Sequence, residues 1–230
     1  MENHTINVPS VEEFARPRSR KDFFKALAVA GAGAATGSLL LSRKANAQSG
    51  NADVDIANFA LTLEYLEADF YTKAVDSGVL SGDALGVVTN LRDHENAHVD
   101  AITSLLKGAG AQPVAKPEFT YPAGAFDSQD SILQLAGTFE PVGVGAYIGA
   151  APLITSPDIL AAAGSIEGIE GEHVVAVNNL LGVVPPANEA MPAGMTKDEV
   201  LAAVAPFLGM GSMMDTGGPA PRSGSTFRAI

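Results

Sequence analysis

Four stretches of the chain place apolar residues at alternating steps of three and four, the spacing that lines one face of a helix. They cover about residues 53–77, 83–108, 129–153 and 157–181. Helix start and stop signals bound them: Gly78 follows the first, Ser81 precedes the second, and Ser156 with Pro157 opens the fourth. The pattern predicts an all-α protein built from four long helices.

The connections between these helices predict how the helices are arranged. The first and last links are only a few residues long, so each flanking pair should form an antiparallel hairpin. Residues 109–126, between the hairpins, contain Pro113, Pro117 and Pro122 and show no helical period. At roughly 3.3 Å per residue, an extended segment of this length can run the length of a bundle. We therefore expect a four-helix bundle of two hairpins joined by a long crossover.

The chain beyond the four helices forms a separate C-terminal extension. We assign residues 48–182 to the bundle and residues 183–230 to this extension. The capping-box spacing from Thr196 to Glu199 predicts a short helix over residues 196–208. The remainder is rich in Gly, Ser, Pro and Met and is predicted to be a flexible tail.

Residues 1–47 have the features of an export signal. The segment 19–25 resembles the twin-arginine consensus, with Lys21 in place of the second arginine, and Ala45-Asn46-Ala47 fits a cleavage site. The apolar run between them, residues 26–41, is shorter than the roughly 20 residues that a membrane-spanning helix needs. We expect a twin-arginine-type signal peptide, a periplasmic or secreted protein, and no stable membrane anchor after cleavage. An uncleaved anchor is the alternative.

Composition narrows the chemistry. The chain has no cysteine, which excludes disulfides and thiolate metal sites, so any metal must be bound by oxygen and imidazole. Residues 48–230 contain seven basic and twenty-two acidic side chains. Such an acidic body repels phosphate backbones, which argues against nucleic-acid binding and favours cations.

Ionisable residues occupy the middle of all four apolar stripes. The second and fourth helices carry Glu-x-x-His pairs, and the first and third carry one glutamate each: Glu95 with His98, Glu170 with His173, Glu64 and Glu140. An unpaired carboxylate in a core costs several kcal/mol, and four carboxylates together would repel one another unless cations stood among them. Two divalent ions would balance the four glutamates. The pattern predicts a metal site inside the bundle.

The spacing also predicts that these residues meet at one level. The midpoint between Glu64 and Glu95 falls inside the first hairpin link, and the midpoint between Glu140 and Glu170 falls inside the second. Residues equally far from an antiparallel turn lie at the same height. Glutamate with histidine suits iron or manganese, with zinc as a further candidate.

This pattern resembles the ferritin-like di-iron and di-manganese carboxylate bundles. Residues 63–71 and 139–147 look like the exported ferritin-like family that includes desiccation-related proteins. The resemblance implies two iron ions, or alternatively two manganese ions, with these ligands: Glu64 and Glu140 as single glutamates, Glu95 and Glu170 as bridging or chelating carboxylates, and His98 and His173 as imidazole ligands.

The resemblance implies redox chemistry on oxygen, peroxide or ferrous iron in stress protection, as in a ferroxidase or a catalase- or peroxidase-like oxidoreductase. The alternative is a non-catalytic desiccation, stress-protection or metal-binding protein whose site is structural or vestigial. The expected partners are metal ions and a small oxidant, and a homo-oligomer is compatible with either function.

Tyr71 and Tyr147 stand seven residues after Glu64 and Glu140, two helical turns away. They could bond a ligand carboxylate, take part in redox steps, or simply pack in the core. Pro141 should bend the third helix next to Glu140.

Three other polar residues flank the stripes. We expect His94 at the surface, because it lies off the stripe of the second helix. Glu67 and Glu167 are expected to be solvated helix-face glutamates, with a supporting or extra-ligand role as the alternative.

Overall fold

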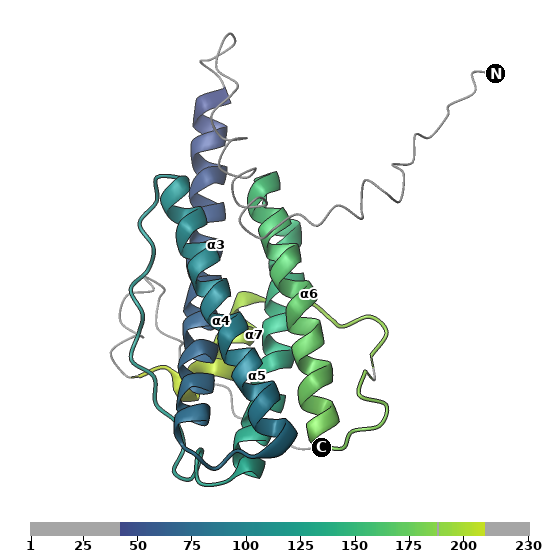
Figure 1. Cartoon of the computed structure of the whole chain (residues 1–230). Helices are drawn as coiled ribbons and strands as arrows, with labels where there is room; N and C mark the ends of the chain where they lie inside the picture. Colours follow the sequence, from purple (N-terminus) through teal and green to yellow (C-terminus); the bar gives the residue numbers. More distant parts are fainter. Residues whose placement is uncertain (1–41, 188, 210–230) are drawn as a thin grey trace, which may run out of the picture. The chain divides into compact units, whose positions relative to one another are not determined.

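The computed structural model describes residues 42–187 and 189–209. The compact unit that contains the bundle begins at Ala45; the other unit is residues 1–44. The long helices are α3 (Ser42–Asp76), α4 (Gly82–Gly108), α5 (Gln129–Ala150) and α6 (Pro157–Leu180), followed by the short α7 (Lys197–Val204) (Figure 1). Two 3₁₀ turns, η1 (Ala151–Leu153) and η2 (Ala205–Phe207), extend α5 and α7. The predicted four-helix bundle with a short C-terminal helix is confirmed.

Three helix ends differ from the prediction. The C-terminal ends of α5 and α7 are 3₁₀ turns, and α3 begins earlier than predicted. Pro152 and Pro206 lie in the 3₁₀ turns that replace the last α-helical turns expected for the third helix and the short C-terminal helix. Proline has no N–H to continue the α-helical ladder. At the other end, α3 begins at Ser42 rather than near residue 53. The rest of the predicted signal lies outside the described residues.

Local side-chain bonds explain where α5, α6 and α7 begin, whereas Ser81 before α4 forms no side-chain cap bond. Ser128 forms a capping box with Ser131 at the start of α5, and Thr196 forms one with Glu199 at the start of α7. The Ser156 hydroxyl accepts a bond from the Ile159 N–H at the start of α6. These caps satisfy backbone donors that the first turn of a helix leaves without partners.

None of the helices in the described part of the chain has the length and apolar character that crossing a membrane requires.

The segment between α4 and α5 is the predicted crossover. Its backbone N–H at Val114 donates to the Asn58 side chain at 2.7 Å, and farther along Lys116 pairs with Asp69 at 2.8 Å. The crossover therefore follows α3 from its N-terminal half toward its C-terminal half (Figure 1). Phe119 then forms an isolated antiparallel bridge with Leu208, which ties the crossover to the residues after α7.

The C-terminal extension returns to the bundle over two glycines of α5. The Met195 N–H donates to the Gly145 carbonyl at 2.7 Å, and a Cβ on Gly149 would lie only 1.9 Å from the Met195 carbonyl oxygen. The absence of side chains at these two positions lets the backbone of the extension lie directly on the helix. Farther along the extension, Val200 and Val204 of α7 are buried in the core.

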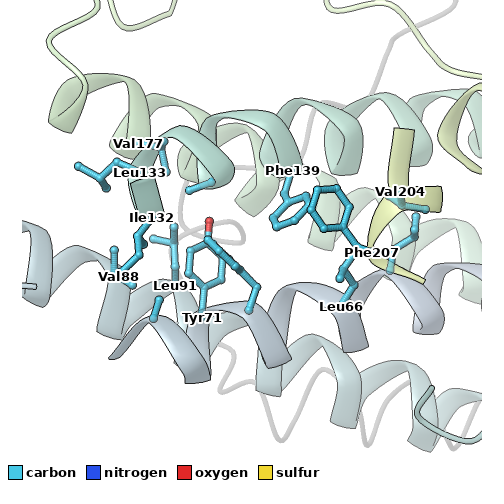
Figure 2. Close-up of a cluster of buried hydrophobic side chains, with 14 of the residues drawn as sticks. Leu66, Tyr71, Val88, Leu91, Ile132, Leu133, Phe139, Val177, Val204 and Phe207 are labelled. Carbon is cyan, nitrogen blue, oxygen red and sulfur yellow. The ribbon is translucent and has the colours of Figure 1, made fainter. Parts of the chain in front are cut away.

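Two hydrophobic clusters fill the bundle. The larger cluster contains Tyr71, Leu91, Leu133 and Val177 and is shown in Figure 2. The smaller contains Leu61, Ile102, Tyr147 and Ile166. On α4, α5 and α6 the predicted ligand positions lie between residues of the larger and the smaller cluster. The predicted ligands thus form a polar layer across the bundle. Apolar side chains on both sides separate this layer from the ends of the bundle.

Candidate metal centre

The six side chains predicted as metal ligands come together in this layer. All are buried, the most accessible being His98 at 8% exposed. Each long helix supplies its part: Glu64 from α3, Glu95 and His98 from α4, Glu140 from α5, and Glu170 and His173 from α6. The height argument made from the hairpin links therefore holds.

The six residues form two overlapping groups of four. One group is Glu64, Glu95, His98 and Glu170, and the other is Glu95, Glu140, Glu170 and His173. Within each group one ligand atom per residue lies within 4.8 Å of every other. Glu95 and Glu170 belong to both groups. The geometry thus offers two adjacent cation positions, each with its own glutamate and imidazole, that share two carboxylates.

Both imidazoles turn the same nitrogen toward the carboxylates. His98 Nδ1 lies 3.1 Å from Glu64 Oε2, 3.0 Å from Glu95 Oε2 and 3.2 Å from Glu170 Oε1. His173 Nδ1 lies 2.9 Å from Glu95 Oε1 and 3.3 Å from Glu140 Oε2. The two halves of the layer therefore present the same donor set in the same way.

The two tyrosines join the hairpins to each other. The Tyr71 hydroxyl on α3 donates to Glu140 Oε1 on α5, and the Tyr147 hydroxyl on α5 donates to Glu64 Oε1 on α3. Each tyrosine thus holds the unshared glutamate of the opposite hairpin and leaves its second oxygen toward the imidazoles. Both hydroxyls are buried, and each has found the partner that a buried tyrosine needs.

Pro141 does not displace Glu140. Helix α5 runs without a break from Gln129 to Ala150 with the proline inside it, and Glu140 is fully buried beside His173. Tyr71 supplies one bond that fixes this carboxylate. Glu140 therefore keeps its predicted place among the clustered residues.

Comparison with protein-family models matches the ferritin-like domain over residues 52–183, more than half of the chain and all six clustered residues. The chain belongs to this family. Among curated proteins no relative was found.

Hydrogen bonding in this ferritin-like layer is incomplete without a cation. Within the described part of the chain, five buried atoms lack a hydrogen-bond partner in the layer: Glu95 Oε1, Glu140 Oε2, both oxygens of Glu170, and His173 Nδ1. The 2.9 Å approach of His173 Nδ1 to Glu95 Oε1 is close but is not a hydrogen bond. Each buried polar atom without a partner costs about 1–3 kcal/mol. Their number and convergence fit a pair of metal ions bound by oxygen and nitrogen.

The pKa values show what the layer holds when metal is absent. Burial raises the pKa of Glu95 to about 8 and that of Glu140 to about 7, and repulsion from Glu170 adds to both shifts. Burial opposes protonated imidazole, but the closely approaching carboxylate oxygens outweigh it and raise the pKa of His98 and His173 to about 12. Protons therefore take the place of metal, and a metal must displace them to bind.

His94 is not the surface residue that we expected from its position off the stripe. It is half-buried, and its Nδ1 lies 2.9 Å from His173 Nε2, with the two rings stacked at 5.2 Å. If His173 binds metal through Nδ1, its Nε2 carries the proton and donates it to His94. His94 stands three residues after Leu91 and four before His98. A step of three followed by a step of four also keeps a residue on the apolar face, so this spacing could have predicted that His94 lies near the site.

Glu67 is also not the solvated glutamate that we expected. It is only 4% exposed, and burial followed by repulsion from Glu170 and Glu95 raises its pKa well above the ordinary value. It stands three residues after Glu64 and four before Tyr71, the same helical face. Glu167, the other glutamate in question, is half-exposed.

Proposed function

We propose that this ferritin-like protein is exported and holds two iron or two manganese ions, which it uses for redox chemistry on oxygen, peroxide or ferrous iron. The observation that carries the proposal is the pair of four-residue groups that share Glu95 and Glu170. A single metal would need only one such group. Two adjacent ions that share ligands can divide the electrons of a two-electron reaction.

The residues of the chain have distinct tasks in this proposal. Glu95 and Glu170 belong to both groups, so they would hold the two ions next to each other. Tyr71 and Tyr147 keep the unshared glutamates in place through bonds across the hairpins. The hydrophobic clusters on both sides of the layer exclude water, which strengthens every charge interaction inside it.

The first test is metal content, measured by plasma mass spectrometry on protein purified without added metal. We expect about two iron or manganese ions per chain, and loss of both when Glu95 and His98 are changed together to alanine. Glu172→Ala is the matched control, because Glu172 lies on α6 beside the site but is exposed. Unchanged metal content in the double variant, with the helices preserved, would contradict the proposal.

The second test separates catalysis from protection. The loaded protein should consume peroxide or ferrous iron faster than the same amount of free metal. Two bound ions without such consumption would support the non-catalytic, stress-protecting alternative instead.

Export is tested on the full chain. Arg20→Lys should leave the precursor inside the cell, whereas the unchanged chain should yield a mature protein that begins at Gln48.

A further inference from the structure

Glu67 is a buried carboxylate that the six-ligand set does not use. It belongs to neither group of four, although its side chain is only 4% exposed. A carboxylate buried without a partner costs several kcal/mol unless its charge is balanced or it holds a proton. Its position next to the layer therefore needs an explanation that helix propensity or packing does not provide.

The Glu67 carboxylate and the shared ligand Glu170 both lie next to Gly143. A Cβ added to Gly143 would lie 3.4 Å from Glu67 Oε1 and 3.1 Å from Glu170 Oε2. Both oxygens therefore border the same small space above Gly143 of α5. Glu67 comes from α3, whereas His98 and His173 come from α4 and α6.

With Glu67, the carboxylates near the centre carry more negative charge than two divalent ions would balance. The four ligand glutamates already balance two divalent ions. A fifth carboxylate is favourable when the ions carry more charge, and the buried layer makes that interaction stronger than it would be in water.

We propose that Glu67 is a fifth carboxylate of the centre, which stabilises its metal ions in the higher oxidation state from its position beside Glu170. The inference depends on the dinuclear centre proposed above. Glu67 acts through its charge and position rather than as one of the six ligands. Gly143 is the complementary feature, because a larger residue there would close the space that Glu67 and Glu170 share.

The experiment compares four forms of the metal-loaded chain: the unchanged protein, Glu67→Gln, Glu67→Asp and Glu167→Gln. Glu67→Gln should shift the midpoint potential upward by about 59 mV, a tenfold change toward the reduced state for one electron. Glu67→Asp retains the charge and should stay near the unchanged protein. Glu167→Gln removes the same charge from a half-exposed position one turn from Glu170, where solvent screening should leave less than about a twofold change.

A second readout needs no redox activity. Gallium(III) and zinc(II) are redox-inert probes of trivalent and divalent charge, and Glu67→Gln should lower the ratio of gallium to zinc affinity by about tenfold. If Glu67→Gln does not fold, Glu67→Ala carries the same expectation.

The two proposals fail in different ways. If the unchanged protein binds two metals but Glu67→Gln alters neither the potential nor the affinity ratio, the role of Glu67 is wrong and the centre stands. If the unchanged protein binds no metal, both proposals are wrong.

Discussion

The two hairpins supply the same ligands but not the same surroundings. In each, a glutamate precedes a tyrosine by seven residues and a Glu-x-x-His pair by about thirty. Three residues after the first glutamate, however, the α3–α4 hairpin has Glu67 and the α5–α6 hairpin has Gly143. Just before the Glu-x-x-His pair, the first has His94 and the second Ile169. The metal positions are thus equivalent in their ligands and unequal in what supports those ligands.

The comparison also shows why the halves depend on each other. His94 of the first hairpin bonds His173 of the second, and the tyrosine bonds cross between hairpins in both directions. Gly143 of the second hairpin provides the space beside which Glu67 of the first lies. Neither hairpin alone forms a complete four-residue group, because each group contains carboxylates from both.

The largest expected effect separates shared from unshared ligands. Glu170→Ala should abolish binding of both metals, because Glu170 belongs to both groups. Glu64→Ala should remove or weaken only one, leaving about one ion per chain. Metal content by plasma mass spectrometry, with circular dichroism to verify the helices, measures this difference. Equal loss in the two variants would contradict the assignment of shared and unshared carboxylates.

The next effect is that of pH, which should treat both halves alike. Metal-free Glu95 and Glu140 keep protons to about pH 8 and 7, whereas an unfolded chain releases them near 4.5. The unfolded state then binds fewer protons, so the free energy of unfolding should fall as pH rises from about 5 to 8. His98 and His173, with pKa values raised from 6.5 to about 12, act in the same direction above pH 6.5.

Bound metal should remove this loss of stability. Metal binds the deprotonated ligands, so its affinity rises with pH and stabilises the folded state where the metal-free protein loses stability. Melting temperatures of the metal-free and metal-loaded protein between pH 5 and 8 would measure the difference. Glu170 acts oppositely, but only at acid pH: the nearby imidazoles of His173 and His98 outweigh burial and lower its pKa from 4.5 to about 2. A metal-free protein that becomes more stable from pH 5 to 8 would contradict the protonated network.

A smaller effect should distinguish the two metal positions. His94→Ala removes the acceptor for His173 Nε2 and should weaken metal binding about 10–100-fold at the position that His173 serves. The position served by His98 should change little. A calorimetric titration should therefore separate into two steps, whereas Asn96→Ala, at an exposed position on α4, should leave the titration unchanged. Equal weakening at both positions would show that His94 does not act through His173.

The smallest expected effect compares two helical glycines by the sign of their change in stability. Gly143→Ala places a methyl group 3.1 Å from Glu170 Oε2 and should destabilise the protein by about 1–3 kcal/mol. Gly168→Ala on α6 meets nothing within 4 Å and should stabilise the protein by about 0.5–1 kcal/mol. Urea unfolding of both variants measures the two changes. A stabilising Gly143→Ala would show that the space above Gly143 is not needed.

Much of the fold could be predicted because its signals are local. The apolar period marked the four long helices, and the cap at Ser156 and the capping box at Thr196 are present at the predicted positions. The helix ends near Pro152 and Pro206 were less predictable, since each of these prolines lies in a 3₁₀ turn whereas Pro141 lies inside α5 without ending it.

Helix period and hairpin length together specify face and height, so the order of residues was enough to predict that four glutamates and two histidines would meet at one level of a bundle. Only the tertiary structure decided which carboxylates are shared, since that depends on how four helices approach one another. It also decided that His94 and Glu67 are drawn into the site. Both lie at the edge of an apolar stripe, where burial is set by the neighbouring helix rather than by the residue's own spacing.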